Sequence, residues 1–199
     1  MLIRLLLKIV LDFLKPWFFN GGDTETNGLD IVSTLNFDIP NGHLLLKTAM
    51  NFTDTEVTNK GELETPSNLA DYTDQVLLGR ANTVRYENSG PDHVFQFSAM
   101  VRKPTCNYMV KLNNWGEVTI PSGSEEREQV LSSKWTLDAE YSFQLSSQTR
   151  LAFGVNNAFD TYPDKTIKRN SFNGIFQHSG YSPFGFNGRY LYARVNMSL

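Results

Sequence analysis

Residues 134–144 read KWTLDAEYSFQ, and this stretch decides the fold class of the chain. Apolar side chains stand at every odd residue number of the stretch and polar side chains at every even residue number. Successive side chains of a β-strand point to opposite faces, so a repeat of two is typical of a strand. A helix would need apolar residues three or four positions apart. The stretch therefore predicts a strand with one apolar and one polar face.

The same alternation recurs along most of the chain. Aromatic residues make up 13% of the sequence, and such a composition favours strands over helices. We therefore predict an all-β antiparallel fold of about seven strands, which pair in sequence order. The six further segments that alternate are residues 26–38, 43–55, 93–103, 106–116, 149–158 and 188–199.

The connections between these segments alternate in length. Short turns are expected at 40–42, 103–105 and 146–148, and long connections at 56–90, 117–132 and 159–187. Outer-membrane barrels have tight turns at one rim and long loops at the other, and their strands need about 9–11 residues to cross the hydrocarbon. The pattern thus predicts an antiparallel transmembrane β-barrel meander with short turns at one rim. A soluble β-sandwich remains the alternative, because alternation does not say which face is covered.

In the barrel interpretation, the two sets of side chains have different surroundings. Aromatic residues near strand ends would lie at the two membrane interfaces, and they are Phe37, Phe52, Phe95, Trp135 and Phe143. Charged residues on the polar face would line a lumen and could pair across it. These are Lys47, Arg102, Lys111, Asp138, Glu140, Arg150 and Arg194.

The composition excludes several function classes. The formal net charge is -3, so the basic surface that nucleic-acid binding requires is missing, and we predict no nucleic-acid partner. The one cysteine, Cys106, and the histidines at 43, 93 and 178 show no metal-ligand spacing. Asp138 and Glu140 share a strand face, but the arginines expected beside them favour charge pairing over acid–base chemistry. We predict no catalytic residue, no metal and no cofactor, and therefore no enzyme.

Residues 1–19 differ from the rest of the chain. They read MLIRLLLKIVLDFLKPWFF, with Arg4 ahead of an apolar stretch as in a signal peptide. Lys8 and Asp12 interrupt the apolar stretch, and no small-residue cleavage site follows. The stretch is also too short and too charged to span a bilayer as a helix. We expect a non-native or poorly ordered segment at 1–19, without strand pairing to the barrel, and a barrel region at 20–199. The alternative is a signal or interfacial anchor helix.

Four stretches resemble TonB-dependent outer-membrane receptors. Residues 23–30 (DTETNGLD) are similar to a strand entry of that family, and residues 80–91 loosely match a charged stretch that ends in Pro before a strand. Residues 154–160 (GVNNAFD), followed by Tyr162 and Pro163, resemble the penultimate strand, and residues 182–189 (SPFGFNGR) resemble the lead-in to the last strand. Many family members end in Phe or Trp, whereas this chain ends in Leu199.

The resemblance implies strands 16 to 22 of a 22-stranded barrel in the cell outer membrane of a Gram-negative organism. Full receptors of this family take up siderophore-iron, haem, cobalamin or glycans, and they depend on a plug domain and on the TonB complex. Implied partners are therefore outer-membrane lipid, the remaining barrel strands and the plug, with TonB bound only by the full-length receptor. We expect a truncated fragment that does not itself transport. The alternative is a small independent β-barrel or a soluble β-sandwich that binds an apolar ligand.

Motif residues are expected to have structural roles, and substrate-binding residues are not assigned. Gly154 fits a crowded lumen wall. Asn156 and Asn157 are suited to tie the strand end to the following loop through side-chain to backbone hydrogen bonds.

Overall fold

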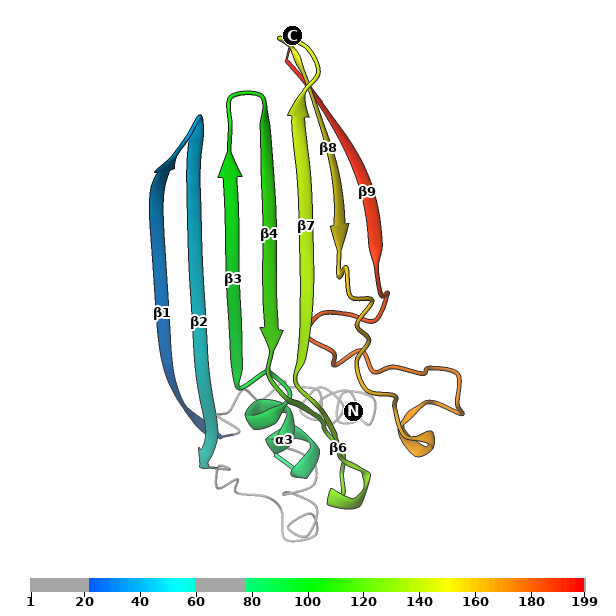
Figure 1. Ribbon diagram of the computed structural model, residues 1–199. Coiled ribbons are helices and arrows are strands. Elements are labelled where there is room, and N and C mark those ends of the chain that lie inside the picture. Colours follow the sequence, from blue (N-terminus) through cyan, green and yellow to red (C-terminus); the bar gives the residue numbers. More distant parts are fainter. Residues whose placement is uncertain (1–21, 60–77, 199) are drawn as a thin grey trace, which may run out of the picture.

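The computed structural model describes residues 22–59 and 78–198. The predicted N-terminal segment, residues 1–19, lies outside the described residues. Seven strands form one antiparallel sheet in the order β1-β2-β3-β4-β7-β8-β9, which confirms the predicted meander (Figure 1). The strands are β1 (Asp23–Ile39), β2 (Gly42–Asn59), β3 (His93–Arg102), β4 (Cys106–Trp115), β7 (Lys134–Gln144), β8 (Thr149–Asn156) and β9 (Tyr190–Met197).

Short turns lie at one end of the sheet and long connections at the other, as the sequence predicts (Figure 1). The β1–β2 turn contains Asn41 at φ 59°, a left-handed conformation that Asn tolerates better than most residues. The β3–β4 turn is closed by the amide of Lys103, which donates to the carbonyl of Cys106 at 2.8 Å. The two ends of the sheet are called here the turn end and the loop end.

The long connections contain secondary structure that the alternation did not predict. A helix, α3 (Arg80–Asn88), precedes Pro91 and β3, and a small hairpin, β5 (Val118–Ile120) with β6 (Gln129–Leu131), links β4 to β7. Two short 3-10 turns, η2 (Glu125–Arg127) and η3 (Lys168–Asn170), complete the loop end. The sequence pattern did not predict this helix, because the helix buries only Val84 and its sequence therefore has no apolar stripe.

The sheet is open, with β1 and β9 at its edges, and among the described residues only Ala152 is a buried apolar side chain on its strands. The buried apolar cluster of the described residues belongs instead to the β5–β6 hairpin, where Val118, Ile120 and Leu131 pack together against Tyr181. None of the described residues belongs to a helix that could cross a membrane. The two strands of the hairpin are thus held by a satellite cluster at the loop end.

Shortening Leu131 to alanine should loosen the hairpin locally. Leu131 is 2% exposed, and truncation of a buried leucine costs about 2 to 5 kcal/mol. Its neighbour Val130 is 55% exposed and serves as the matched control. Hydrogen exchange should show faster exchange at the β5–β6 amides in Leu131→Ala, with β3 and β4 unchanged and Val130→Ala like the wild type. Equal exchange in the two variants would contradict this account of the cluster.

Candidate functional site

One face of the sheet is apolar from edge to edge. A row of directly paired residues crosses all seven strands and contains only apolar side chains: Leu35, Leu46, Ala99, Val110, Ala139, Val155 and Leu191. A second such row, nearer the turn end, contains Phe37, Leu44, Val101, Tyr108, Tyr141, Phe153 and Ala193. We call this surface the apolar face.

The apolar face is not covered by a second layer among the described residues. Leu35 is 50% exposed, Val110 45% and Leu191 72%, although buried positions are usual for such side chains in a folded domain. The other sheet is the small β5–β6 hairpin, which lies at the loop end (Figure 1). The described residues therefore do not form the two stacked sheets of a β-sandwich.

Aromatic side chains gather toward the two ends of the apolar face. At the loop end Phe52 meets Phe95 with ring centroids 5.3 Å apart, and Trp135 is 49% exposed. At the turn end Tyr108 and Tyr141 lie with ring centroids 4.9 Å apart. Of the five aromatic residues singled out from the sequence, four lie near strand ends as predicted: Phe37, Phe95, Trp135 and Phe143. The prediction is wrong for Phe52, because β2 continues beyond it to Asn59.

The opposite face is mostly polar and hydrogen-bonded, although Leu45, Met100 and Met109 form an apolar row on it. The row next to the first apolar row contains Thr34, Lys47, Ser98, Lys111 and Asp138. Lys111 Nζ lies 3.0 Å from Asp138 Oδ2, and the Asp138 side chain is only 16% exposed. We call this surface the polar face.

A buried amide extends this polar row along the sheet. Asn113 is 4% exposed, and its side chain accepts a hydrogen bond from Gln96 Nε2 at 3.0 Å and donates to Thr136 Oγ1 at 3.3 Å. Three neighbouring strands are thus linked by side chains as well as by the backbone ladder. The buried side-chain amide of Asn113 thus has a partner on each neighbouring strand, as low-dielectric surroundings require.

Glu140 is the centre of a second group on the polar face. Tyr192 Oη donates to Glu140 Oε2 at 2.7 Å, and Arg194 Nη2 donates to the same carboxylate at 2.9 Å. Asp138 and Glu140 are therefore both paired with cations, which confirms the predicted charge pairing. Lys47 and Arg102 have no ion-pair partner among the described residues, and Arg102 Nε instead donates to Met100 Sδ at 3.1 Å.

Gly154 lies between Glu140 and Tyr192 in the strand register, beneath the tyrosine ring. A Cβ atom at Gly154 would clash with Cζ, Oη and Cε1 of Tyr192. The glycine is therefore required by a close approach, which agrees with the crowded wall predicted for it. Tyr192 can reach Glu140 because nothing stands between them at residue 154.

The substitution Gly154→Val should displace the Tyr192 ring and weaken the β8–β9 pairing. We expect a loss of about 1 to 3 kcal/mol in stability, as for other overpacked sites. Gly90→Ala is the control, because a Cβ there meets nothing within 4 Å. In a double-mutant cycle by chemical unfolding, Tyr192→Ala should abolish most of the cost of the valine. Independent, additive costs would show that the two residues are not coupled.

Asn157 ties the end of β8 to the loop that follows. Its Nδ2 donates to the Thr161 carbonyl at 2.7 Å, and its Oδ1 accepts from the Thr161 amide at 3.0 Å. Its own amide donates to Asp138 Oδ1 at 2.9 Å, so the loop is also tied to the polar face. The predicted role is thus confirmed for Asn157. Asn156 instead ends β8 and pairs through its backbone with Tyr190.

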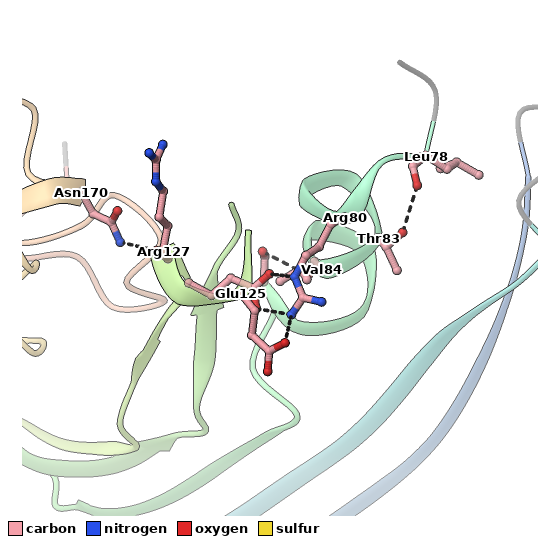
Figure 2. A network of polar contacts seen from close by, with 9 residues as sticks. Leu78, Arg80, Thr83, Val84, Glu125, Arg127 and Asn170 are labelled. Carbon is pink, nitrogen blue, oxygen red and sulfur yellow. Dashed lines mark hydrogen bonds and ion pairs between the residues drawn. The ribbon is translucent and has the colours of Figure 1, made fainter. Parts of the chain in front are cut away.

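At the loop end, α3 is joined to η2 by one arginine (Figure 2). Arg80 donates from Nε and Nη2 to the two carboxylate oxygens of Glu128, at 2.7 and 2.9 Å, and its Nη2 lies 3.6 Å from Glu125. The Glu128 side chain is 14% exposed. A bidentate pair fixes the orientation of both side chains, so the helix is held against the connection between β5 and β6.

The long β8–β9 connection is tied to the same hairpin. Gln129 donates from Nε2 to the Lys165 carbonyl at 2.8 Å and accepts from the Ile167 amide at 2.9 Å. Asn170 Nδ2 donates to the Arg127 carbonyl at 2.7 Å (Figure 2). Three segments far apart in sequence thus form one connected layer at the loop end.

The pKa of the Asp164 carboxyl, which lies in this layer, is lowered in the folded protein. Burial would raise the pKa of the carboxyl, but the hydrogen bonds from Lys134 and Ser132 outweigh burial and lower the pKa from 3.8 to about 2. Lys134 Nζ lies 2.7 Å from Asp164 Oδ1, and the Ser132 amide donates to Oδ2 at 2.6 Å. The carboxylate thus joins the β8–β9 loop to the start of β7.

Because its pKa is lowered in the folded state, Asp164 stabilises the loop above about pH 4 and loses this effect as the pH falls through 2. The pair is partly exposed, so we expect about 1 kcal/mol of local stability. The Ser132 amide resonance should titrate with a midpoint near pH 2, and Asp164→Asn should remove the titration. Glu126→Gln, at an exposed position, is the control. A midpoint near pH 4 would contradict the pairing.

The histidines and the cysteine lie at separate places. His43 contacts Asp38 at the turn end, His93 contacts Asp92 and Asn114 at the loop end, and His178 lies in the β8–β9 connection. Cys106 is free and donates from Sγ to Tyr108 Oη at 3.8 Å. Within residues 22–59 and 78–198, no three His, Cys, Asp or Glu side chains come together in a way that could hold a metal.

Comparisons with known proteins add no family assignment. No protein-family model matches the chain, and a search of curated proteins finds no significant relative.

Proposed function

We propose that this chain forms part of the β-barrel wall of a TonB-dependent receptor in the outer membrane of a Gram-negative cell. The observation that carries the proposal is a single antiparallel sheet with one continuous apolar face and one hydrogen-bonded polar face. In such a wall the apolar face contacts lipid, and the polar face lines the lumen. Lys111, Asp138, Glu140 and Arg194 then belong to the lumenal side.

The sheet edges support a wall that continues beyond these seven strands. Neighbouring strands alternate in direction, so β1 and β9 run the same way. Joining them directly would create a parallel pair, whereas an odd number of further strands between them keeps every pair antiparallel. A barrel of 22 strands would place an odd number of further strands between β1 and β9. Closure is required in a bilayer, because unpaired backbone groups in hydrocarbon are costly.

Contact between two of the receptor-like stretches also supports the proposal. The Arg189 amide donates to Asp160 Oδ1 at 2.8 Å, and Arg189 Nε donates to the Ala158 carbonyl at 3.0 Å. These residues belong to stretches 154–160 and 182–189, which precede and follow the same long loop. The two receptor-like stretches therefore hold the ends of this loop together, a shared structural role that supports the proposal.

In this proposal the receptor takes up a scarce nutrient such as siderophore-iron, haem, cobalamin or a glycan. Energy comes from the TonB complex through a plug within the closed barrel, and the present strands contribute wall and loops. The main rival is a soluble β-sandwich, which would need a second layer over the apolar face. The two differ in whether Trp135 contacts lipid.

Tryptophan quenching by brominated lipid tests the proposal. Trp135 lies on the apolar face and is 49% exposed, whereas Trp115 lies on the polar face and donates to Thr136 Oγ1 at 3.4 Å. In a Trp17→Phe background, the full chain is refolded into brominated-lipid micelles with either Trp115 or Trp135 replaced by Phe. We expect several-fold stronger quenching when Trp135 is the remaining tryptophan.

Circular dichroism on the same samples provides the folding control, since both variants should keep the β-sheet signal. Equal quenching of the two tryptophans, or a folded chain that does not associate with lipid, would favour the soluble rival.

A further inference from the structure

One side of the β1 backbone has no partner strand among the described residues. β1 is 17 residues long, against 8 for β9 at the other edge, and in the sheet it pairs only with β2 (Figure 1). Every residue from Asp23 to Asp38 is exposed. Along an edge strand, alternate N–H and C=O groups point away from the sheet and can pair with another extended chain. We call this side of β1 the outer edge.

The charge of β1 restricts which strand can bind at the outer edge. The strand contains no lysine or arginine, and it carries four carboxylates, at Asp23, Glu25, Asp30 and Asp38. Asp30 Oδ1 accepts a hydrogen bond from Asn51 Nδ2 at 2.8 Å. Asp38 Oδ1 lies 2.8 Å from His43 Nδ1, and the Asp38 side chain is 92% exposed. Within the described residues, neither of these two carboxylates contacts a lysine or an arginine.

A second copy of this chain fits the outer edge poorly. In an antiparallel pair of two β1 strands, each strand would bring four carboxylates and no cation, so the pair would be repulsive in every register. β9 runs the same way as β1, so it would meet the β1 of an equally oriented second copy only in parallel. The one cation of β9, Arg194, already binds Glu140. The outer edge therefore suits a strand of different chemistry.

We propose that the outer edge of β1 binds a basic β-strand, antiparallel to β1, that places Lys or Arg opposite Asp30 and Asp38. Opposite charges directly across neighbouring strands stabilise a sheet. Both aspartates lie on the polar face, and they stand about 26 Å apart along the strand. The two cations therefore lie on one face of the added strand, and its other face continues the apolar face beside Ile31 and Leu35. This inference rests on the proposed function, in which the added strand is the neighbouring strand of the barrel wall.

Two nine-residue peptides test the outer edge on the full chain in zwitterionic lipid micelles. Both alternate threonine or serine with valine or leucine, and they differ only at the first and ninth positions, which are lysine in one peptide and glutamate in the other. Fluorescence anisotropy of the labelled peptides gives the two affinities. At low salt we expect the lysine peptide to bind about 5- to 30-fold more tightly, which corresponds to two cross-strand charge pairs. Equal affinities would overturn the proposal.

Hydrogen exchange locates the bound peptide. The lysine peptide should slow exchange at alternate β1 amides between residues 30 and 38 and leave the β9 amides unchanged. Protection of these β1 amides without peptide would overturn the proposal. The outer edge would then be covered by the chain's own residues or, if the protection rises with protein concentration, by a second copy.

Variants separate the charge of the outer edge from its backbone. Asp30→Asn combined with Asp38→Asn keeps the size of both side chains and removes their charge, so the preference for the lysine peptide should disappear. Asp54→Asn is the matched control, because Asp54 is an exposed carboxylate on β2, away from the outer edge. An unchanged preference in the double variant would contradict the charge pairing. Trp135 quenching reports separately on the wall, so failure of one proposal is distinguishable from failure of the other.

Discussion

The register of the backbone ladder is the constraint on which the rest of this structure depends. Side chains alternate with a period of two, so a slip of one residue between neighbouring strands would move all apolar side chains of a strand to the opposite face. Here the register holds without interruption from Leu35 on β1 to Leu191 on β9. One apolar and one mostly polar face follow, although the buried apolar cluster of the described residues lies outside the sheet.

Side chains on the polar face reinforce this register. Glu140 on β7 receives hydrogen bonds from Tyr192 and Arg194 on β9, two strands away, across the glycine at 154. Asp138 joins Lys111 on β4 to the backbone of Asn157, where the loop end begins. The same carboxylates therefore stabilise the strand pairing and position the long loop, so wall and loop are not independent units.

The loop end supplies the packing that the sheet lacks. Leu131 and Val118 are almost completely buried in the hairpin, and Arg80 and Gln129 connect the helix and the β8–β9 loop to it. The apolar face, by contrast, leaves Val110 and Leu191 exposed. In the barrel wall proposed above, lipid rather than protein would cover that surface.

The amino-acid sequence by itself determined the seven strands, their order and the face of each side chain, because the period of two is a local property of extended backbone. It also identified Asp138, Glu140, Gly154 and Asn157 as structural residues. The tertiary structure alone decided that α3 forms, that Arg80 meets Glu128, and that Gln129 binds the Lys165 carbonyl. Those features depend on contacts between segments far apart in the sequence; Arg80 and Glu128, for example, are separated by 48 residues. Such loop contacts leave no repeat in the sequence.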